Sequence, residues 1–280
     1  MEDEIPNGVW RIDAGTRSVL RFDRARTAFD AGDWAVAVVE AEELLDESPD
    51  HPEALRLVAN ASLELGQPEI AADAFSQLLE SGTAGADVYS GLAVALFDLC
   101  EIPRAIVMAR EAIKRRPDDA EAHYTLALAL ERTGTAESAT HFAAARQLDP
   151  ELYPFPLRLK KPDWERAYEQ ALALVAVDVA TFWDGVPIRW EELPTIDELK
   201  AEHPPIRPTV GGLAAGEPPP EGDTGNQRPA ALRLFQRNLA RAPDKRALAD
   251  DIAAVLESEA MAWLGLTEDD LDAAASDDEP

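Results

Sequence analysis

Residues 52–85, PEALRLVANASLELGQPEIAADAFSQLLESGTAG, are one copy of a unit that repeats every 34 residues over positions 18–150. Each copy predicts two antiparallel helices that approach closely where neither carries a large side chain, with a turn between them at a small residue. Four copies fit, at about 18–51, 52–85, 86–119 and 120–150. Three columns of small residues stay in register through the copies: Ala25, Ala59, Ala93 and Ala127; Gly32, Gly66, Cys100 and Gly134; Ala37, Ala71, Ala105 and Ala139.

This period, with Pro49, Pro117 and Pro150 near the ends of copies, resembles the tetratricopeptide repeat. The resemblance implies an α-solenoid of stacked helix pairs. The first copy departs from the pattern, because Arg21 and Arg24 replace large apolar residues. Terminal repeats are commonly atypical, since one of their faces meets solvent or another domain.

The resemblance implies that the binding surface is the concave face, lined by the first helix of each pair. In this register the candidate groove residues are Phe22, Arg26, Phe29, Arg56, Asn60, Phe97 and Tyr124. We expect Arg26 and Arg56, on adjacent repeats, to hold a carboxylate of an extended peptide while the aromatic side chains hold its apolar groups. Two alternatives stay open. These side chains could pack between repeats, or the groove could hold the chain's own acidic residues 277–280.

The cysteine and the histidines of the repeats favour a structural role. Cys100 occupies the glycine column, where a small residue suits a tight turn. His51 falls in a turn, His123 on a first helix and His141 on a second helix. We expect none of the three histidines to meet another, which argues against a metal site built from them.

The run Tyr153-Pro154-Phe155-Pro156 ends the helical pattern and marks a domain boundary. The rest predicts a small α+β unit. Its expected elements are a helix capped by Asp163 and ending near Phe182, a strand at 186–191, a Pro- and Gly-rich loop at 203–228, a strand at 230–236 and a long helix capped by Asp244. The acidic residues 273–280 are expected to be disordered.

Residues 155–272 are similar, in the order and spacing of several segments, to the minimal zincin-like metallopeptidases. The matching segments are 155–159 (FPLRL), 188–194 (IRWEELP), 208–213 (PTVGGL), 234–239 (LFQRNL) and 263–271 (WLGLTEDDL). The family motif is His-Glu-x-x-His-x-x-Gly-x-x-Asp. In it the two histidines bind Zn²⁺ and the glutamate polarises the attacking water.

At the positions of this motif, the chain lacks both histidine ligands. Ser258 and Ala262 stand at the two histidine positions, Glu259 at the general-base position, Gly265 at the glycine and Glu268 at the third-ligand position. A catalytic zinc needs three protein ligands, and a hydroxyl with one carboxylate does not replace two imidazoles. We therefore expect neither bound zinc nor another cofactor, and a domain retained as a structure.

Glu259 also continues an apolar stripe formed by Leu248, Ile252, Val255 and Leu256. A buried carboxylate must find a hydrogen-bond donor or take a raised pKa. Two alternatives to an inactive interaction domain remain. One is an active zinc peptidase whose ligands are not recognised, for instance one completed by a partner chain, and the other is a domain that only caps the solenoid.

Composition narrows the class of partner. The chain has 280 residues, 54 acidic and 26 basic, for a net charge of −28, which opposes binding to nucleic acid or anionic lipid. It has a single cysteine, no apolar run long enough for a membrane span and an acidic start unlike a signal peptide, so we expect a cytoplasmic protein.

These inferences combine into one prediction of fold and function. We expect a mainly α chain: an extension at 1–17, a tetratricopeptide solenoid of about four repeats at 18–151, a small α+β zincin-like domain at 155–272 and a tail at 273–280. The expected function is a non-catalytic protein–protein interaction scaffold that binds a protein or peptide.

Overall fold

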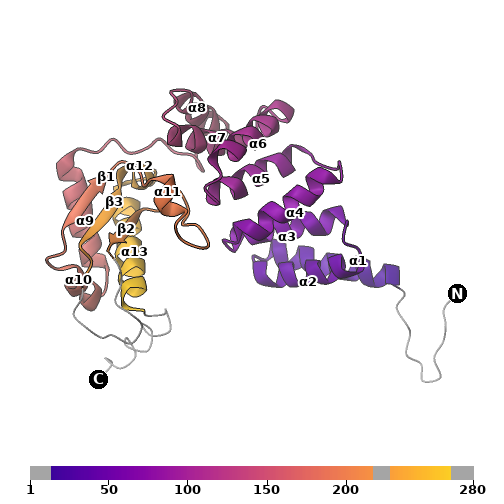
Figure 1. Ribbon diagram of the computed structural model, residues 1–280, viewed down its shortest axis with the longest axis horizontal. Coiled ribbons are helices and arrows are strands. Elements are labelled where there is room, and N and C mark those ends of the chain that lie inside the picture. The colour runs from indigo at the N-terminus through magenta and orange to yellow at the C-terminus, as the bar shows by residue number, and fades with distance from the viewer. Residues whose placement is uncertain (1–13, 217–227, 266–280) are drawn as a thin grey trace, which may run out of the picture. The chain divides into compact units, whose positions relative to one another are not determined.

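A computed structural model describes residues 14–216 and 228–265, which form two compact units (Figure 1). The repeat unit holds the described residues up to Tyr153 together with the segment Lys200–Arg207. The mixed unit holds Pro154–Leu199 and the described residues from Pro208 onward. Each unit has its own hydrophobic core.

The repeat unit consists of antiparallel helix pairs that follow one another in chain order (Figure 1). The helices are α1 (Ala14–Asp30), α2 (Trp34–Glu47), α3 (Pro52–Glu64), α4 (Pro68–Glu80), α5 (Ala86–Asp98), α6 (Ile102–Arg115), α7 (Ala120–Arg132) and α8 (Ser138–Leu148). This arrangement confirms the predicted solenoid. The first alanine column is fully buried, as close approach of the paired helices requires. Ala139 is the exception in the second column, because it lies exposed in the first turn of α8.

The turn within each helix pair takes a left-handed backbone conformation. The φ angles are 82° at Gly32, 71° at Gly66, 60° at Cys100 and 70° at Gly134. Glycine adopts this conformation without strain because it has no Cβ. Cys100 is the one non-glycine with positive φ among the residues that the structure describes.

The mixed unit packs helices on one face of a small mixed sheet (Figure 1). Its elements are α9 (Lys161–Leu174), α10 (Val177–Trp183), β1 (Ile188–Glu191), α11 (Ile196–Leu199), β2 (Gly212–Ala215), β3 (Ala231–Phe235), α12 (Gln236–Leu239) and α13 (Lys245–Leu264). The strand order is β1-β3-β2. β1 runs parallel to β3, with Ile188 opposite Leu232, and β2 runs antiparallel to β3, with Leu213 opposite Arg233.

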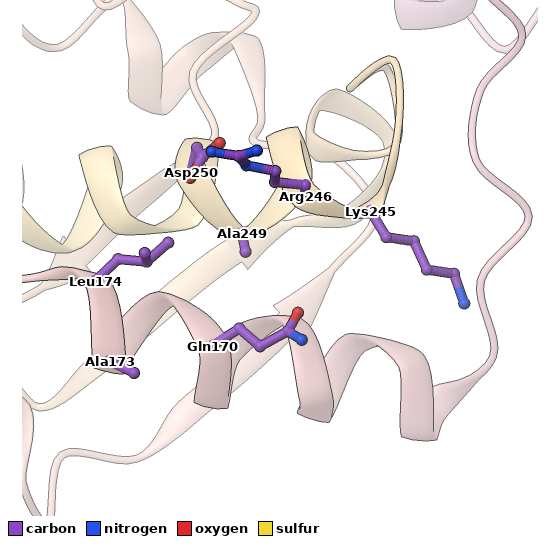
Figure 2. Close-up of a pocket in the computed structure, with 7 residues that line it drawn as sticks. All are labelled: Gln170, Ala173, Leu174, Lys245, Arg246, Ala249 and Asp250. Atoms are coloured by element: carbon purple, nitrogen blue, oxygen red, sulfur yellow. The ribbon is translucent and has the colours of Figure 1, made fainter.

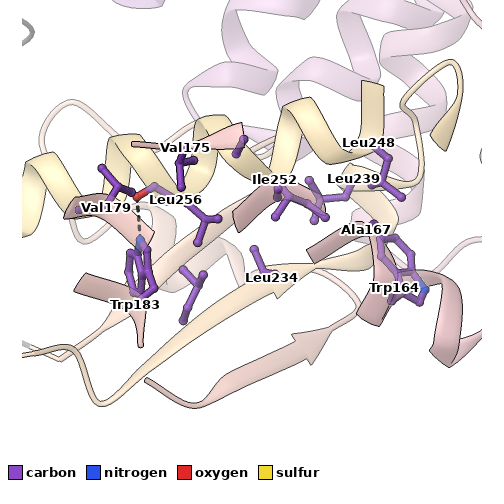
Figure 3. Close-up of a cluster of buried hydrophobic side chains, with 14 of the residues drawn as sticks. Trp164, Ala167, Val175, Val179, Trp183, Leu234, Leu239, Leu248, Ile252 and Leu256 are labelled. Atoms are coloured by element: carbon purple, nitrogen blue, oxygen red, sulfur yellow. Dashed lines mark hydrogen bonds between the residues drawn. The ribbon is translucent and has the colours of Figure 1, made fainter. Parts of the chain in front are cut away.

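The core of the mixed unit lies between the sheet, α9 and α13. Leu234 of β3 and the buried stripe of Leu248, Ile252 and Leu256 on α13 belong to one apolar cluster (Figure 3). The indole Nε1 of Trp183 donates to the carbonyl of Leu256 at 2.9 Å, which satisfies a polar atom inside that cluster (Figure 3). This hydrogen bond joins α10 to α13.

Both predicted strands and the Asp244 cap are confirmed, but two predictions for this half were wrong. The helix predicted from Asp163 is two helices, α9 and α10, and Asp163 lies inside α9, where its carboxylate accepts from the backbone N–H of Lys160 in a capping box. The predicted loop contains a strand, β2. Its start is Gly212, where a Cβ would lie 2.7 Å from the carbonyl oxygen of Arg233, so close pairing excludes a side chain there.

Candidate functional site

α13 carries the positions that correspond to the zinc-binding motif. The helix begins at Lys245 because the Asp244 carboxylate accepts from the N–H groups of Arg246 and Ala247, at 2.8 and 2.9 Å. It ends at Gly265, whose φ of 64° suits a helix C-terminus. Ser258, Glu259 and Ala262 therefore lie in the last two turns of a well-capped helix.

Glu259 is bonded to the edge strand of the sheet. Its Oε2 atom accepts from the backbone N–H of Ala214 in β2 at 2.6 Å. Burial raises the pKa of the Glu259 carboxyl, and the N–H donor of Ala214 acts in the opposite direction. The carboxylate thus has both features expected for a buried acid, a donor and a raised pKa. Its donor ties the end of α13 to β2.

The residues that flank Glu259 do not fit zinc. The hydroxyl of Ser258 is exposed and donates to the Val255 carbonyl at 3.3 Å, and Ala262 is exposed and carries no donor atom. Within residues 14–216 and 228–265, no group of three or more His, Cys, Asp or Glu side chains is arranged to hold a metal. His203 belongs to the repeat unit, and Glu268 lies outside the described residues. The chemistry of this donor set provides no imidazole at either histidine position.

An ion-pair cluster in the mixed unit was missed by the sequence analysis. Arg233, at the centre of β3, donates bidentately to Glu191 of β1, at 3.0 and 2.7 Å, and also contacts Glu198 of α11 at 3.2 Å. The carboxylates raise the pKa of the Arg233 guanidinium, and its donation lowers the pKa of the Glu191 carboxyl. The available signal was an Arg flanked by apolar strand residues, Leu232 and Leu234, which alternation assigns to the other face of β3.

The described surface of the mixed unit also has a shallow pocket of about 460 Å³ between α9 and α13 (Figure 2). Lys245 lines it, but its Nζ atom is 2.7 Å from Asp163 Oδ1. The remaining charges, Arg246 and Asp250, are opposite in sign. The pocket therefore does not define a site for one class of charged ligand.

In the repeat unit, each of the two candidate groove arginines contacts an acidic side chain of its own chain. Arg56 Nε lies 3.0 Å from Asp87 Oδ2, and Arg26 Nη2 lies 3.4 Å from Asp23 Oδ1. Asn60 is exposed. A peptide carboxylate would therefore have to replace Asp87 at Arg56 rather than meet an unpaired cation.

The candidate aromatic residues differ in their exposure. Phe22 is half-buried, stacks on His51 with ring centroids 5.9 Å apart and lies beneath the Arg26 guanidinium. Phe29 packs edge-on against Trp34 within its own helix pair. Phe97 is 3% exposed, so its prediction as a groove residue was wrong and its side chain belongs to the core.

Tyr124 packs against Phe142 and Tyr153, with centroid separations of 5.7 and 4.5 Å. These contacts favour the alternative left open for this residue, packing within the repeats. Phe22 is then the candidate aromatic residue that is neither in the core nor packed chiefly within its own helix pair.

The prediction that the histidines do not meet was wrong for two of them. His123 Nδ1 and His141 Nδ1 are 2.9 Å apart, and the rings stack. His123 Nε2 lies 3.0 Å from the Pro117 carbonyl, and that oxygen can only accept, so Nε2 carries a proton. His141 Nε2 lies 3.4 Å from the Glu137 carboxylate, which also can only accept. Burial lowers the pKa of His141, and the Glu137 carboxylate acts in the opposite direction.

The fold and these sites define a helical-repeat protein joined to a small α+β domain, whose long helix carries the positions that correspond to a metallopeptidase motif. Two protein-family models match the chain. The tetratricopeptide repeat model matches residues 22–87, 59–106 and 90–152, and the zincin-like metallopeptidase model matches residues 183–277. The chain therefore consists of N-terminal tetratricopeptide repeats and a C-terminal zincin-like metallopeptidase domain.

Several solved structures are similar to about half of this chain. One is YrrB, described as a tetratricopeptide repeat protein with an unusual peptide-binding site, at 20% identity over 48% of this chain and 69% of that one, with a TM-score of 0.43. Another is MamA, at 23% identity over 49% of this chain and 75% of that one, with a TM-score of 0.45. A third is a thermophilic tetratricopeptide repeat protein of Thermus thermophilus, at 20% identity over 48% of this chain and 75% of that one, with a TM-score of 0.42.

No curated protein matches the sequence. Among the described helices, none is both long enough and apolar enough to cross a membrane.

Proposed function

We propose that the chain is a cytoplasmic, non-catalytic interaction scaffold in which the repeats bind a protein or peptide and the metallopeptidase-like domain has lost its chemistry. The observation that carries this proposal is the state of the motif on α13. Ser258 and Ala262 supply no nitrogen ligand, and the would-be general base Glu259 is hydrogen-bonded to Ala214. The Glu259 carboxylate therefore supports the packing of β2 on α13 instead of polarising a water.

Zinc titration with a restored-ligand variant tests the loss of chemistry. Native mass spectrometry should find no stoichiometric zinc on the wild-type chain. Incubation with a peptide library should give no cleavage products. The variant Ser258→His/Ala262→His restores two imidazoles one helical turn apart and should gain zinc affinity. A wild-type chain that binds about one zinc, as a catalytic site does, and loses both metal and peptidase activity in Glu268→Ala would overturn the proposal in favour of an active peptidase.

The proposed peptide site centres on Phe22, Arg26, Arg56 and Asn60 of the first two repeats. The pairs of Arg26 with Asp23 and of Arg56 with Asp87 are partly exposed, so their exchange for a ligand carboxylate changes little in the fold. A ligand carboxylate can pair with the guanidinium of Arg56 in place of Asp87, and an apolar side chain can pack against the half-buried Phe22.

Peptides selected from a random library on the wild-type protein provide the ligand for the groove test. Arg26→Ala/Arg56→Ala should weaken their binding by about tenfold or more while the melting temperature stays nearly constant. The matched control is Arg104→Ala on α6, the second helix of its pair, which removes an exposed ion pair with Glu101. This variant should bind the selected peptides as the wild type does. Equal binding by the double variant would refute the groove.

Deleting residues 273–280 distinguishes an open groove from one filled by the chain's own tail. If the tail occupies the groove, its deletion should strengthen peptide binding by the wild-type chain. The double arginine variant should then show no such gain, because it lacks the residues that would hold the tail.

A further inference from the structure

The segment Lys200–Arg207 lies between α11 and β2 in the sequence, yet in space it belongs to the repeat unit. At Pro208 the chain enters the mixed unit, where the Pro208 carbonyl accepts from the buried Asn238 side chain at 2.9 Å. The segment is thus the part of the α11–β2 connection that packs with the repeats, and it ends at Arg207.

Arg207 forms an ion pair with the largely buried carboxylate of Asp98. Its Nε atom lies 3.4 Å from Oδ2 of Asp98, the last residue of α5, whose side chain is 13% exposed. Burial raises the pKa of the Asp98 carboxyl, and the charge of Arg207 acts against that rise. Arg207 also passes close to the α3–α4 turn, because a Cβ at Gly66 would lie 3.1 Å from its Nη2 atom.

Ile206, the residue before Arg207, contacts Cys100, the residue that replaces glycine in the glycine column. The Cys100 thiol donates to the carbonyl of Ile206 at 3.5 Å, and Cys100 is 2% exposed. Glycine would fit the left-handed backbone at this turn without strain. Cys100 is therefore both the residue that replaces glycine at this turn and the residue whose side chain contacts the segment. A non-glycine residue in a left-handed conformation indicates a role for its side chain.

We propose that the α3–α4 and α5–α6 turns form a docking site for an extended segment in which arginine follows an apolar residue, and that Ile206-Arg207 fills this site in the free chain. The site is separate from the concave groove. Asp98 supplies the charge that selects arginine, and Cys100 supplies a donor for the preceding carbonyl. Pro204 and Pro205 restrict the backbone ahead of these contacts, which lowers the entropy cost of docking. A second arginine-containing peptide must displace the resident segment.

Limited trypsin digestion of the full-length chain tests the resident contact, because Lys200 is a cleavage site inside the segment. The rate of cleavage after Lys200, followed by mass spectrometry, reports how often the segment leaves the repeats. Asp98→Asn and Arg207→Ala should each raise that rate by about tenfold, since loss of a charge-assisted contact shifts the open population by that order. Cys100→Gly should raise the rate while leaving the melting temperature equal or higher, because glycine relieves the turn.

Glu101→Gln is the matched control, since Glu101 adjoins Cys100 but pairs with Arg104. Its cleavage rate should equal that of the wild type. Unchanged cleavage in both Asp98→Asn and Arg207→Ala would overturn the proposal. An amidated, labelled peptide of residues 200–210 supplies a second readout by fluorescence anisotropy. It should bind the Arg207→Ala chain more tightly than the wild type and the Asp98→Asn chain least. Equal binding to the Arg207→Ala and Asp98→Asn chains would equally count against the site.

Discussion

Glu259, which stands at the general-base position of the family motif, makes a contact between α13 and the sheet. In the family motif this carboxylate lies beside a metal, and here it accepts from the Ala214 N–H at the sheet edge. Its surroundings are apolar enough to raise the pKa of the carboxyl, so ionisation at neutral pH costs folding free energy. A neutral side chain of the same shape should serve this position better than the glutamate does.

We predict that Glu259→Gln raises the free energy of unfolding at pH 7 by up to about 1–2 kcal/mol, because the amide oxygen can still accept from Ala214. The raised pKa makes the wild-type contribution greatest below the unfolded-state pKa, and that contribution is lost as pH rises through the folded-state pKa. The advantage of glutamine should therefore shrink as pH falls toward about 4. Urea unfolding at a series of pH values measures this change.

Glu257→Gln on the same helix is the control for removing a negative charge. An equal gain in Glu257→Gln would mean that loss of overall negative charge, not the burial of Glu259, causes it. A large loss at pH 7 would show that the carboxylate contributes more than its bond to Ala214.

At the scale of elements, Arg233 joins three of them. It lies on β3 and contacts Glu191 of β1 and Glu198 of α11. Removing one partner from such a cluster leaves carboxylates close together without their cation. The Arg233 side chain is 21% exposed, so solvent reduces the cost relative to a fully buried pair.

We expect Arg233→Ala to lower the free energy of unfolding of the mixed unit by about 1–2 kcal/mol at pH 7. The pKa of Glu191 is lowered in the fold, so the stability it contributes is present above the unfolded-state pKa and is lost as pH falls through the folded-state pKa. The cost of the substitution should accordingly be smaller in acid. Tryptophan fluorescence during urea unfolding reports it, with the exposed Arg166→Ala on α9 as control.

The elements that could be predicted from sequence are those whose pattern is periodic. The register of the alanine and glycine columns predicts the helix pairs, and Asp244 predicts the start of α13. β2 was not predicted because its first residue, Gly212, has no side chain to contribute to an alternating apolar and polar pattern. A side chain there would collide with the Arg233 carbonyl of β3. The partner of Glu259 was out of reach for the same reason, since Ala214 belongs to that strand. Missing ligands at Ser258 and Ala262 were readable from the motif alone.

Contacts between elements were harder to predict than the elements themselves. His123 and His141 lie on paired helices, and only the packing of α7 on α8 brings their rings together. The acidic partners of Arg26 and Arg56 likewise depend on side-chain placement. Asp87 is far from Arg56 in sequence and close to it in the stacked repeats. A groove argued from one face of a helix therefore leaves out the charges that neighbouring helices supply.

At the scale of the whole molecule, a net charge of −28 dominates the electrostatics. Many of its ion pairs are short-range and exposed, and each such pair contributes little. Self-repulsion among the excess carboxylates acts over a longer range and opposes the compact state. Screening should therefore relieve more repulsion than it removes attraction.

We predict that raising sodium chloride from about 10 mM to about 300 mM at pH 7 raises the melting temperature by about 2–4 °C, because the Debye length falls from about 30 Å to below 8 Å. The protein supplies its own control, since near its pI of about 4.4 the net charge is small and the same salt step should have little effect. Differential scanning calorimetry at both pH values measures the pair of shifts. A fall in melting temperature with salt at pH 7 would mean that local attraction, such as that of Arg233 for its two glutamates, outweighs the repulsion of the whole chain. An equal rise at both pH values would point to salt acting on apolar burial instead of on charge.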